Sequence, residues 1–372
     1  MVSASTKSAS GGARRTDLDI IRIVICAAVI LAHALLIFAA EPRYHLKAPE
    51  WYPATVSYEF MRATTMAVFF LVAGLATVMS LRGRSVKAYV SSRINRILVP
   101  LFIGIVTLGP VIKYIELSHG RNLSKRGIAL VAPLDVDFLH FLPLYFTHSR
   151  LVTWSHLWFL AYLFAYSIVF LPIMVWLARR PAKSEMPPAF VVYLPGLLLA
   201  AQVVAFNGYW PFLPTLFKDP NTILFALCFL LGAMFAVWPG FEARLRQQAV
   251  GMVLLLAAAF SGIVWFGESL AGRVCVGLTA WAAVGASLAL GARYAPPKNA
   301  ALDYLAQATL PIYIVHHVPL LLIALAILPL AIPVLAKIAV IAGLTMVVSL
   351  ALYHFLIRPM PPVRWAVGMP AR

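Results

Sequence analysis

Two ionisable side chains, Arg22 and His33, interrupt the apolar stretch at residues 17–40. As an α-helix this stretch is roughly 36 Å long, which is enough to cross a hydrocarbon core of about 30 Å. Arg22 and His33 are eleven positions apart, which on an α-helix is roughly 20° off three full turns and a rise of about 16 Å. The two side chains therefore share one face. We expect Arg22 near the helix entrance and His33 near the bilayer midplane, where an ionisable group requires a cavity or a partner.

A second candidate site is the basic segment at residues 82–100, RGRSVKAYVSSRINRILVP. It contains no acid, and its five cations are Arg82, Arg84, Lys87, Arg93 and Arg96. On a helix, Arg93 and Arg96 occupy one face because they are three positions apart. Two interpretations remain open. The segment is either a topology determinant that contacts lipid phosphates, or a clamp in which paired guanidinium groups bind a pyrophosphate or a nucleotide 3′-phosphate.

Further candidates are the tandem histidines His316 and His317 in LPIYIVHHVPLL, and His156 and Trp158 in HLWFL. Histidines within a span can line an active site, but they can equally bond to neighbouring backbone carbonyls. Trp158 lies at an expected outer boundary of the membrane, where tryptophan is also an ordinary interfacial anchor. Both interpretations stay open for these four residues.

Membrane-spanning helices are the elements that must position these side chains. Apolar residues make up 62% and charged residues 12% of the 372 positions, a balance that soluble domains do not show. We therefore predict an all-α, polytopic integral membrane protein with ten transmembrane helices. The expected spans are residues 17–40, 56–80, 97–117, 156–178, 188–206, 221–238, 249–266, 272–291, 309–328 and 333–357.

The charge and the cysteine content of the chain limit the kinds of ligand and cross-link that we expect. The net charge is +17, but the basic residues lie mainly in short loops between apolar spans, so anionic lipid or an anionic cytosolic ligand is expected rather than nucleic acid. The three cysteines lie within apolar spans at positions without metal-ligand spacing, and we predict neither a disulfide framework nor a metal site.

The distribution of cations also predicts the topology. Cations concentrate in alternate loops, which places both termini in the cytosol. We expect a disordered cytosolic tail at residues 1–16, a single transmembrane domain at residues 17–358 and a cytosolic tail at residues 359–372. The aromatic piece FLHFLPLYF in the long loop before His156 could lie on the outer interface as a lid.

Five segments together resemble the membrane-bound acyltransferase 3 family. They are, in order, DLDIIRIVICAAVILAH, FFLVAGL, SSRINRILVP, HLWFL and PIYIVHH. The run RILVPLFIG, followed by Pro110 and Tyr114, is similar to the branch that succinylates osmoregulated periplasmic glucans. One departure is Ala73, which stands where the family often has a serine before the glycine of the FFL segment.

The resemblance implies transfer of an acyl group from cytosolic acyl-coenzyme A, as succinyl-CoA or acetyl-CoA, to a hydroxyl of an extracytoplasmic carbohydrate such as a periplasmic glucan. It implies a multi-pass protein of the bacterial inner membrane. His33 would be the catalytic residue and Arg22 its partner, with Asp19 near Arg22. The implied donor-binding residues are Arg82, Lys87, Arg93 and Arg96, and the implied substrate-binding residues are His156, Trp158, His316 and His317.

The expected mechanism is general-base catalysis by His33, because burial favours the neutral imidazole that can accept a proton from the acceptor hydroxyl. An additional cation such as Arg62 could receive a succinyl carboxylate. The main alternative is a proton-coupled transporter or lipid flippase in which His33 belongs to a relay, and another is a non-catalytic membrane module. Acyl group, acceptor and oligomeric state remain open at this stage.

Overall fold

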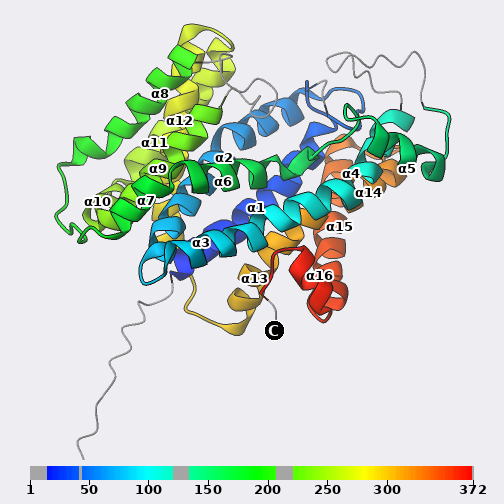
Figure 1. Cartoon of the computed structure of the whole chain (residues 1–372). Helices are drawn as coiled ribbons and strands as arrows, with labels where there is room; N and C mark the ends of the chain where they lie inside the picture. Colours follow the sequence, from blue (N-terminus) through cyan, green and yellow to red (C-terminus); the bar gives the residue numbers. More distant parts are fainter. Residues whose placement is uncertain (1–14, 42–43, 120–133, 207–220, 371–372) are drawn as a thin grey trace, which may run out of the picture.

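The computed structural model describes residues 15–41, 44–119, 134–206 and 221–370, and the regular structure within these ranges is entirely helical. Within these ranges, seven helices are long and apolar enough to cross a membrane, and the number rises to ten when each of three bent helix pairs counts as one span. The predicted all-α, polytopic fold is confirmed (Figure 1). The expected tail at residues 1–16 lies almost wholly outside the described residues.

The unbroken candidate spans are α1 (Thr16–Leu36), α2 (Tyr52–Leu81), the run α3 (Val86–Arg93), η1 (Ile94–Leu98) and α4 (Val99–Ser118), the run η4 (Ala189–Tyr193) and α8 (Leu194–Phe206), α11 (Ala249–Phe266), α12 (Leu270–Tyr294), and α15 (Val334–Ala351) with η5 (Leu352–Ile357). The bent pairs are η3 (Ser155–Leu157) and α6 (Trp158–Val169) with α7 (Leu171–Ala178), α9 (Thr222–Val237) with α10 (Pro239–Gln247), and α13 (Ala300–Val315) with α14 (His317–Ile327). Two short helices complete the described chain, α5 (Phe138–Thr147) and α16 (Pro361–Ala366).

Helix α1 lies in the middle of the molecule, in contact with α2, α12, α13, α14 and α15 (Figure 1). It ends at Leu36, so the prediction that it continues to residue 40 is wrong. Lys47 explains the early end, because its ammonium donates to the carbonyl oxygens of Leu36 (3.0 Å) and Ala39, and a cation stabilises a helix C-terminus. His33 therefore lies in the last turn of α1, about 25 Å along the helix from its first residue.

Two glycines allow α2 and α9 to pack backbone against backbone. A Cβ atom on Gly74 of α2 would lie 1.8 Å from the carbonyl oxygen of Phe229, and one on Gly232 of α9 would lie 1.9 Å from that of Leu71. Small residues at such crossings let transmembrane helices approach closely and gain dispersion contacts. The pair fixes α2 beside α9.

The helix pair α13 and α14 is bent by 64° at His316. Pro311 lies inside α13 and Pro319 lies in the first turn of α14. Proline has no backbone N–H and its ring crowds the preceding turn, so two prolines around one junction account for the bend. The bend leaves His316 and His317 at the junction of two helices.

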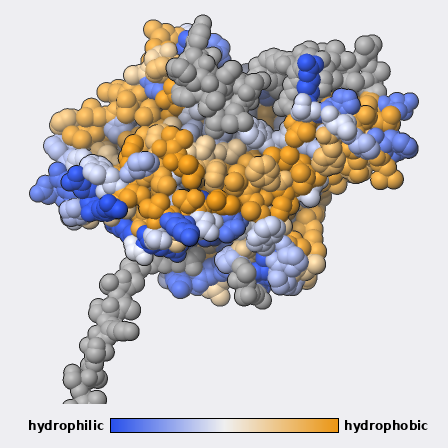
Figure 2. Space-filling view, in the orientation of Figure 1, coloured by the Kyte–Doolittle hydropathy of each residue, from blue (hydrophilic) through white to orange (hydrophobic). Residues whose placement is uncertain are grey.

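The outer helices carry the surface expected of a protein in lipid. On α11, the side chains of Val250, Leu254 and Trp265 are 74%, 65% and 84% exposed. Hydrophobic side chains cover the middle of the face seen in Figure 2, and hydrophilic ones gather along its lower edge. Exposed apolar surface of this extent indicates a lipid-facing helix.

The aromatic piece FLHFLPLYF forms most of α5, which packs on α4 through Phe141 and Tyr145. The Tyr145 hydroxyl donates to the carbonyl oxygen of Ile105 at 2.8 Å. On its other side Leu139 and Phe146 are exposed. Helix α5 is thus amphipathic, with one side on the helical bundle and an apolar side facing outward.

The predicted cytosolic tail at residues 359–372 contains a helix, α16, that packs on the rest of the molecule. Helix α16 contacts α4 and η5, and the buried guanidinium of Arg364 donates to the carbonyl oxygens of Arg358 (3.3 Å) and Pro370 (2.9 Å). Gly368 adopts a left-handed backbone conformation with a φ of 74°, and a Cβ atom there would lie 2.5 Å from the carbonyl oxygen of Arg96. This end of the chain therefore packs beside the basic segment.

Candidate active site

Four of the residues selected from sequence meet in one cluster of histidine rings. His33 lies at the end of α1, His156 lies in η3, and His316 and His317 lie at the α13–α14 junction. The centroid of the His317 ring is 4.6 Å from that of His33 and 4.7 Å from that of His156. His316 stacks on His33 at 5.4 Å. The fold thus brings three distant parts of the chain together, with His317 at the centre.

Two of these rings are held by backbone carbonyls, which determines their tautomers. His156 Nε2 lies 2.9 Å from the carbonyl oxygen of Ile314, and His316 Nδ1 lies 2.7 Å from that of Tyr313. A carbonyl oxygen only accepts, so each of these nitrogens is the N–H of its neutral ring. The hydroxyl of Tyr313 in turn donates to the carbonyl oxygen of His156. His156 and His316 form a fixed wall.

The remaining ring nitrogens of the cluster have no hydrogen-bond partner among the described residues, which makes them candidates for binding a substrate. Among the described residues, no partner is present for His33 Nδ1, His156 Nδ1, His316 Nε2 or either nitrogen of His317. Buried polar atoms are usually hydrogen-bonded, so several unpartnered nitrogens in one place call for an explanation. His156, His316 and His317 are all buried, whereas His33 is partly exposed. His33 is therefore the least buried member of the cluster, although its Nδ1 atom is itself buried.

A second polar group adjoins the cluster, and sequence reasoning missed it. Ser155 Oγ lies 2.8 Å from His45 Nε2, and His45 Nδ1 lies 2.6 Å from Glu116 Oε2. Lys113 Nζ donates to the same carboxylate oxygen at 2.9 Å. The His45 ring is 5.3 Å from that of His317, which joins the two groups. Only the adjacency of Ser155 to His156 in the sequence hinted at this arrangement.

Three histidines of the cluster have ring nitrogens close enough together to be considered as ligands of a metal ion. One nitrogen from each of His33, His316 and His317 lies within 4.8 Å of the others. No metal-ligand spacing is visible in the sequence, since these residues come together only in the fold. Tetrahedral zinc with Zn–N bonds of about 2.0–2.1 Å needs nitrogens about 3.4 Å apart.

Arg22 lies away from the cluster, about 16 Å along α1 from His33. It forms an ion pair with the buried Asp19 at 3.7 Å. Nearby, Arg15 donates to Asp17 (2.7 Å) and Glu242 (2.6 Å). Burial alone would lower the pKa of Arg15, but the hydrogen bonds and charges of these two carboxylates outweigh it and raise the pKa above its usual value. Charge pairing thus attaches the start of α1 to α10.

The basic segment keeps its positive charge available. Arg93 donates to the hydroxyl of Thr77 at 3.0 Å and Arg82 to the carbonyl oxygen of Ala236 at 2.9 Å, so both partners are uncharged. Arg96 lies near the like charge of Arg93, and Lys87 is exposed. The prediction places Arg93 and Arg96 on one face of a regular α-helix. They do not lie on a single regular α-helix, because η1 is a π-helical turn that begins directly after Arg93 and contains Arg96.

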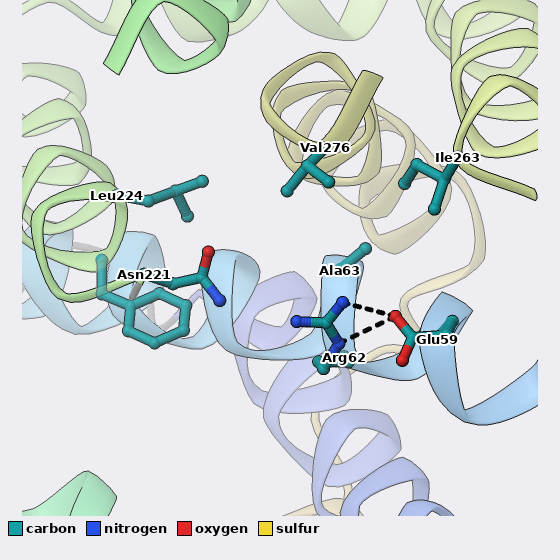
Figure 3. Close-up of a pocket in the computed structure, with 8 residues that line it drawn as sticks. Glu59, Arg62, Ala63, Asn221, Leu224, Ile263 and Val276 are labelled. Atoms are coloured by element: carbon teal, nitrogen blue, oxygen red, sulfur yellow. Dashed lines mark hydrogen bonds and ion pairs between the residues drawn. The ribbon is translucent and has the colours of Figure 1, made fainter. Parts of the chain in front are cut away.

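Trp158 does not join the histidines. It stacks on Phe225 at a centroid distance of 5.7 Å. Phe225 also lines a pocket between α2, α9, α11 and α12, where Arg62 donates to Glu59 through Nε (2.8 Å) and Nη2 (2.5 Å). Figure 3 shows Asn221 on the side of Arg62 opposite to Glu59. Trp158, at the start of α6, therefore contacts this pocket through Phe225, and the pocket is lined by both charged and apolar side chains.

Comparison with known proteins agrees with the geometry. The family described as an acyltransferase domain, acyltransferase 3, matches residues 15–354. The glucans biosynthesis protein C of Salmonella schwarzengrund (strain CVM19633) and that of Salmonella typhi are each 26% identical to this chain over 335 residues, which is 82% of each chain. No solved structure matches. The matched region contains the histidine cluster and the basic segment, and the chain belongs to the acyltransferase 3 family of membrane proteins.

Proposed function

We propose that this protein is an O-acyltransferase that moves a succinyl or acetyl group from cytosolic acyl-coenzyme A to a hydroxyl of an extracytoplasmic carbohydrate. Family membership supports the reaction class, and the relatives named glucans biosynthesis protein C favour a periplasmic glucan as acceptor. We place the protein in the bacterial inner membrane with residues 17–358 as one transmembrane domain and with both termini in the cytosol.

The observation that carries the proposal is the state of His33. The residue is partly exposed within a cluster of buried histidines, and its buried Nδ1 has no partner among the described residues. A neutral imidazole in this position can take the proton of an acceptor hydroxyl as the oxygen attacks the thioester carbonyl. A positioned general base contributes about 10²–10⁴-fold to the rate.

The donor would enter from the end of the molecule that carries the basic segment. Guanidinium groups bind phosphates through multiple charge-assisted hydrogen bonds, and Arg93 and Arg96 have no carboxylate among the partners described above. Coenzyme A carries its phosphates at one end and its thiol at the other. We propose that Arg82, Lys87, Arg93 and Arg96 hold the phosphates while the pantetheine arm extends toward His33, with Arg22 and Asp19 along its path.

The acceptor would approach from the opposite end. His317, whose two nitrogens have no partner in the described part of the chain, can donate one N–H to the oxyanion, since a neutral imidazole always carries one. Trp158 and Phe225 offer aromatic faces beside the Glu59 and Arg62 pocket. An aromatic face and a paired charge are suited to a sugar ring with its hydroxyls.

A second candidate function is a proton-coupled transporter or flippase. The contiguous rings of His33, His317 and His45, with Glu116 beyond them, favour it because they could form a proton relay. Such a protein would move its substrate without consuming a thioester.

The test is acyl transfer by the purified protein and by His33→Ala. With labelled succinyl- or acetyl-CoA and glucan oligosaccharides, we expect release of free thiol and labelled glucan, slowed about 10²–10⁴-fold in the variant. His148→Ala is a matched control, because His148 is an exposed histidine outside the cluster. Full activity of folded His33→Ala would contradict the proposed role of His33. Substrate movement into vesicles without thiol release would favour the transporter.

A further inference from the structure

The polar group beside the histidine cluster has the connectivity of a hydrolase-type triad. A serine oxygen lies 2.8 Å from one nitrogen of His45, and the other nitrogen lies 2.6 Å from a carboxylate oxygen of Glu116. Both distances are within hydrogen-bond range. Since the carboxylate accepts from Nδ1, His45 Nε2 is left as the acceptor for the Ser155 hydroxyl. A nucleophile, a base and a group that orients the base are thus in series.

The backbone of Ser155 is unusual as well. Its φ is +44°, the one positive value for a residue other than glycine among the described residues. Side chains disfavour this region, and such strain concentrates at active sites where the surrounding structure holds a side chain in place. Here the surroundings do so directly, because the backbone N–H of Ser155 donates to Thr153 Oγ1 at 3.0 Å and the next residue, His156, is bonded to Ile314.

Glu116, His45 and Ser155 differ in burial in the way that a catalytic triad requires. The side chain of Glu116 is 4% exposed and that of Lys113 is 2% exposed, while His45 is 15% exposed and Ser155 is partly exposed. The carboxylate is therefore shielded and held by two partners, and access increases toward the serine. A buried carboxylate bonded to imidazole stabilises the imidazolium form and fixes the orientation of the ring.

We propose that Ser155 carries the acyl group covalently between donor and acceptor, with His45 as its base and Glu116 as a positioning residue. This proposal rests on the acyltransferase function proposed above and divides that transfer into two steps. It gives the enzyme an acyl-serine ester intermediate rather than direct transfer from coenzyme A to the sugar.

In the first step, Ser155 Oγ attacks the thioester carbonyl and its proton passes to His45 Nε2. The C–S bond breaks and coenzyme A leaves as its thiolate, while protonated His45 remains beside Glu116. In the second step, the acceptor hydroxyl attacks the ester carbonyl and gives its proton to His33. The bond between the carbonyl carbon and Oγ breaks, and Oγ regains the proton held by His45. His33 then releases its proton to solvent, so the overall change is thioester and alcohol to ester, thiolate and a proton.

The test is covalent labelling of the full-length protein by acyl-labelled CoA in the absence of acceptor, followed by acid quench and peptide mapping. We expect label on the peptide that contains Ser155, at up to one acyl group per chain, and its loss when glucan oligosaccharide is added. Ser155→Ala should remain unlabelled and should transfer on the order of 10³-fold more slowly, as expected for a lost nucleophile. Ser167→Ala is the matched control, because Ser167 is a buried serine of α6 that bonds only within its own helix.

Two further variants separate the triad from a structural role. Ser155→Cys should give a thioester that neutral hydroxylamine cleaves, whereas the wild-type oxygen ester needs alkaline hydroxylamine. Glu116→Gln should slow labelling about 10²-fold without changing the affinity for acyl-CoA, because Glu116 acts through His45. His33→Ala should still acquire label but should not pass it to glucan.

The outcomes distinguish this proposal from the one on which it rests. If the wild type transfers acyl groups while Ser155→Ala does so equally well, or if rapid quench finds no label on residue 155, the covalent relay is wrong and direct transfer stands. Label on His33 instead of Ser155 would also overturn it. If the wild type neither releases thiol nor acylates any glucan, the acyltransferase proposal fails and the relay fails with it.

Discussion

His33 differs from the other histidines of its cluster in being less buried. His156 and His316 donate to backbone carbonyls and are buried, so they shape the site. His33 is partly exposed as a residue, and its buried Nδ1 has no partner among the described residues. At the residue scale, we propose that His33 exchanges a proton with the substrate while His156 and His316 form a fixed framework around it.

The sequence was sufficient to select His33, because an ionisable group in an apolar span must face a partner. It was not sufficient to find Ser155, His45 and Glu116. Their contacts join residues 110 and 71 positions apart, and serine, histidine and glutamate in loops or at helix ends are unremarkable one at a time. Only the fold reveals that they form a series.

Arg96→Ala tests the donor end. We expect a rise in KM for acyl-CoA of about 10-fold or more with little change in kcat, because a charge-assisted hydrogen bond to phosphate contributes about 1.5–3 kcal/mol to binding. Steady-state kinetics with varied acyl-CoA measure this effect. Arg179→Ala, which removes an exposed arginine elsewhere in a loop expected on the same side, should leave KM unchanged. Equal effects of the two substitutions would indicate a general loss of surface charge instead of a phosphate site.

At the scale of elements, the bends and irregular turns position the site. The 64° bend between α13 and α14 presents His316 and His317, and the early end of α1 presents His33. Apolar runs in the sequence located most of these helices. They could not reveal the bends, because hydropathy is the same for a straight and a broken helix. The end of α1 also depends on Lys47, which lies beyond the apolar stretch.

Gly74→Ala tests the α2–α9 crossing. A methyl group there would lie 1.8 Å from the carbonyl oxygen of Phe229, so the helices must separate. We expect a loss of about 3 kcal/mol or more, as for overpacking that moves backbone, and a marked fall in Tm measured in detergent. Gly343→Ala is the control, since a methyl group on this α15 glycine meets nothing within 4 Å. It should be neutral or stabilising by up to about 1 kcal/mol. Equal Tm values for the two variants would contradict the close crossing.

At the scale of the whole molecule, the proposed activity requires two ends with different partners. The basic segment lies between α2 and α4, and the group of Ser155, His45 and Glu116 lies at the opposite end of α4, whose last turn contains Glu116. From the positive-inside rule, we propose that the basic end faces the cytosol. The chain is thereby suited to take a donor from one side and serve an acceptor on the other.

Cysteine labelling tests this orientation. Lys87→Cys and Asp137→Cys each place a thiol at an exposed position, at opposite ends of the run from α3 to α4 and the following loop. In intact cells stripped of the outer membrane, a membrane-impermeant maleimide should label Asp137→Cys but not Lys87→Cys, and inverted vesicles should give the reverse. The unsubstituted chain controls for Cys26, Cys228 and Cys275. Labelling of Lys87→Cys from outside would reverse the proposed topology.

The most direct measurement of the central claim is transfer across a sealed membrane. Purified protein is reconstituted into vesicles that enclose glucan oligosaccharides, and acyl-labelled CoA is supplied only outside, to protein oriented with its basic end outward. We expect labelled glucan inside the vesicles with an equal amount of free thiol outside, and a rate at least about 10²-fold lower for His33→Ala. Enclosed glucan that stays unlabelled while glucan outside is acylated, or undiminished transfer by folded His33→Ala, would contradict it.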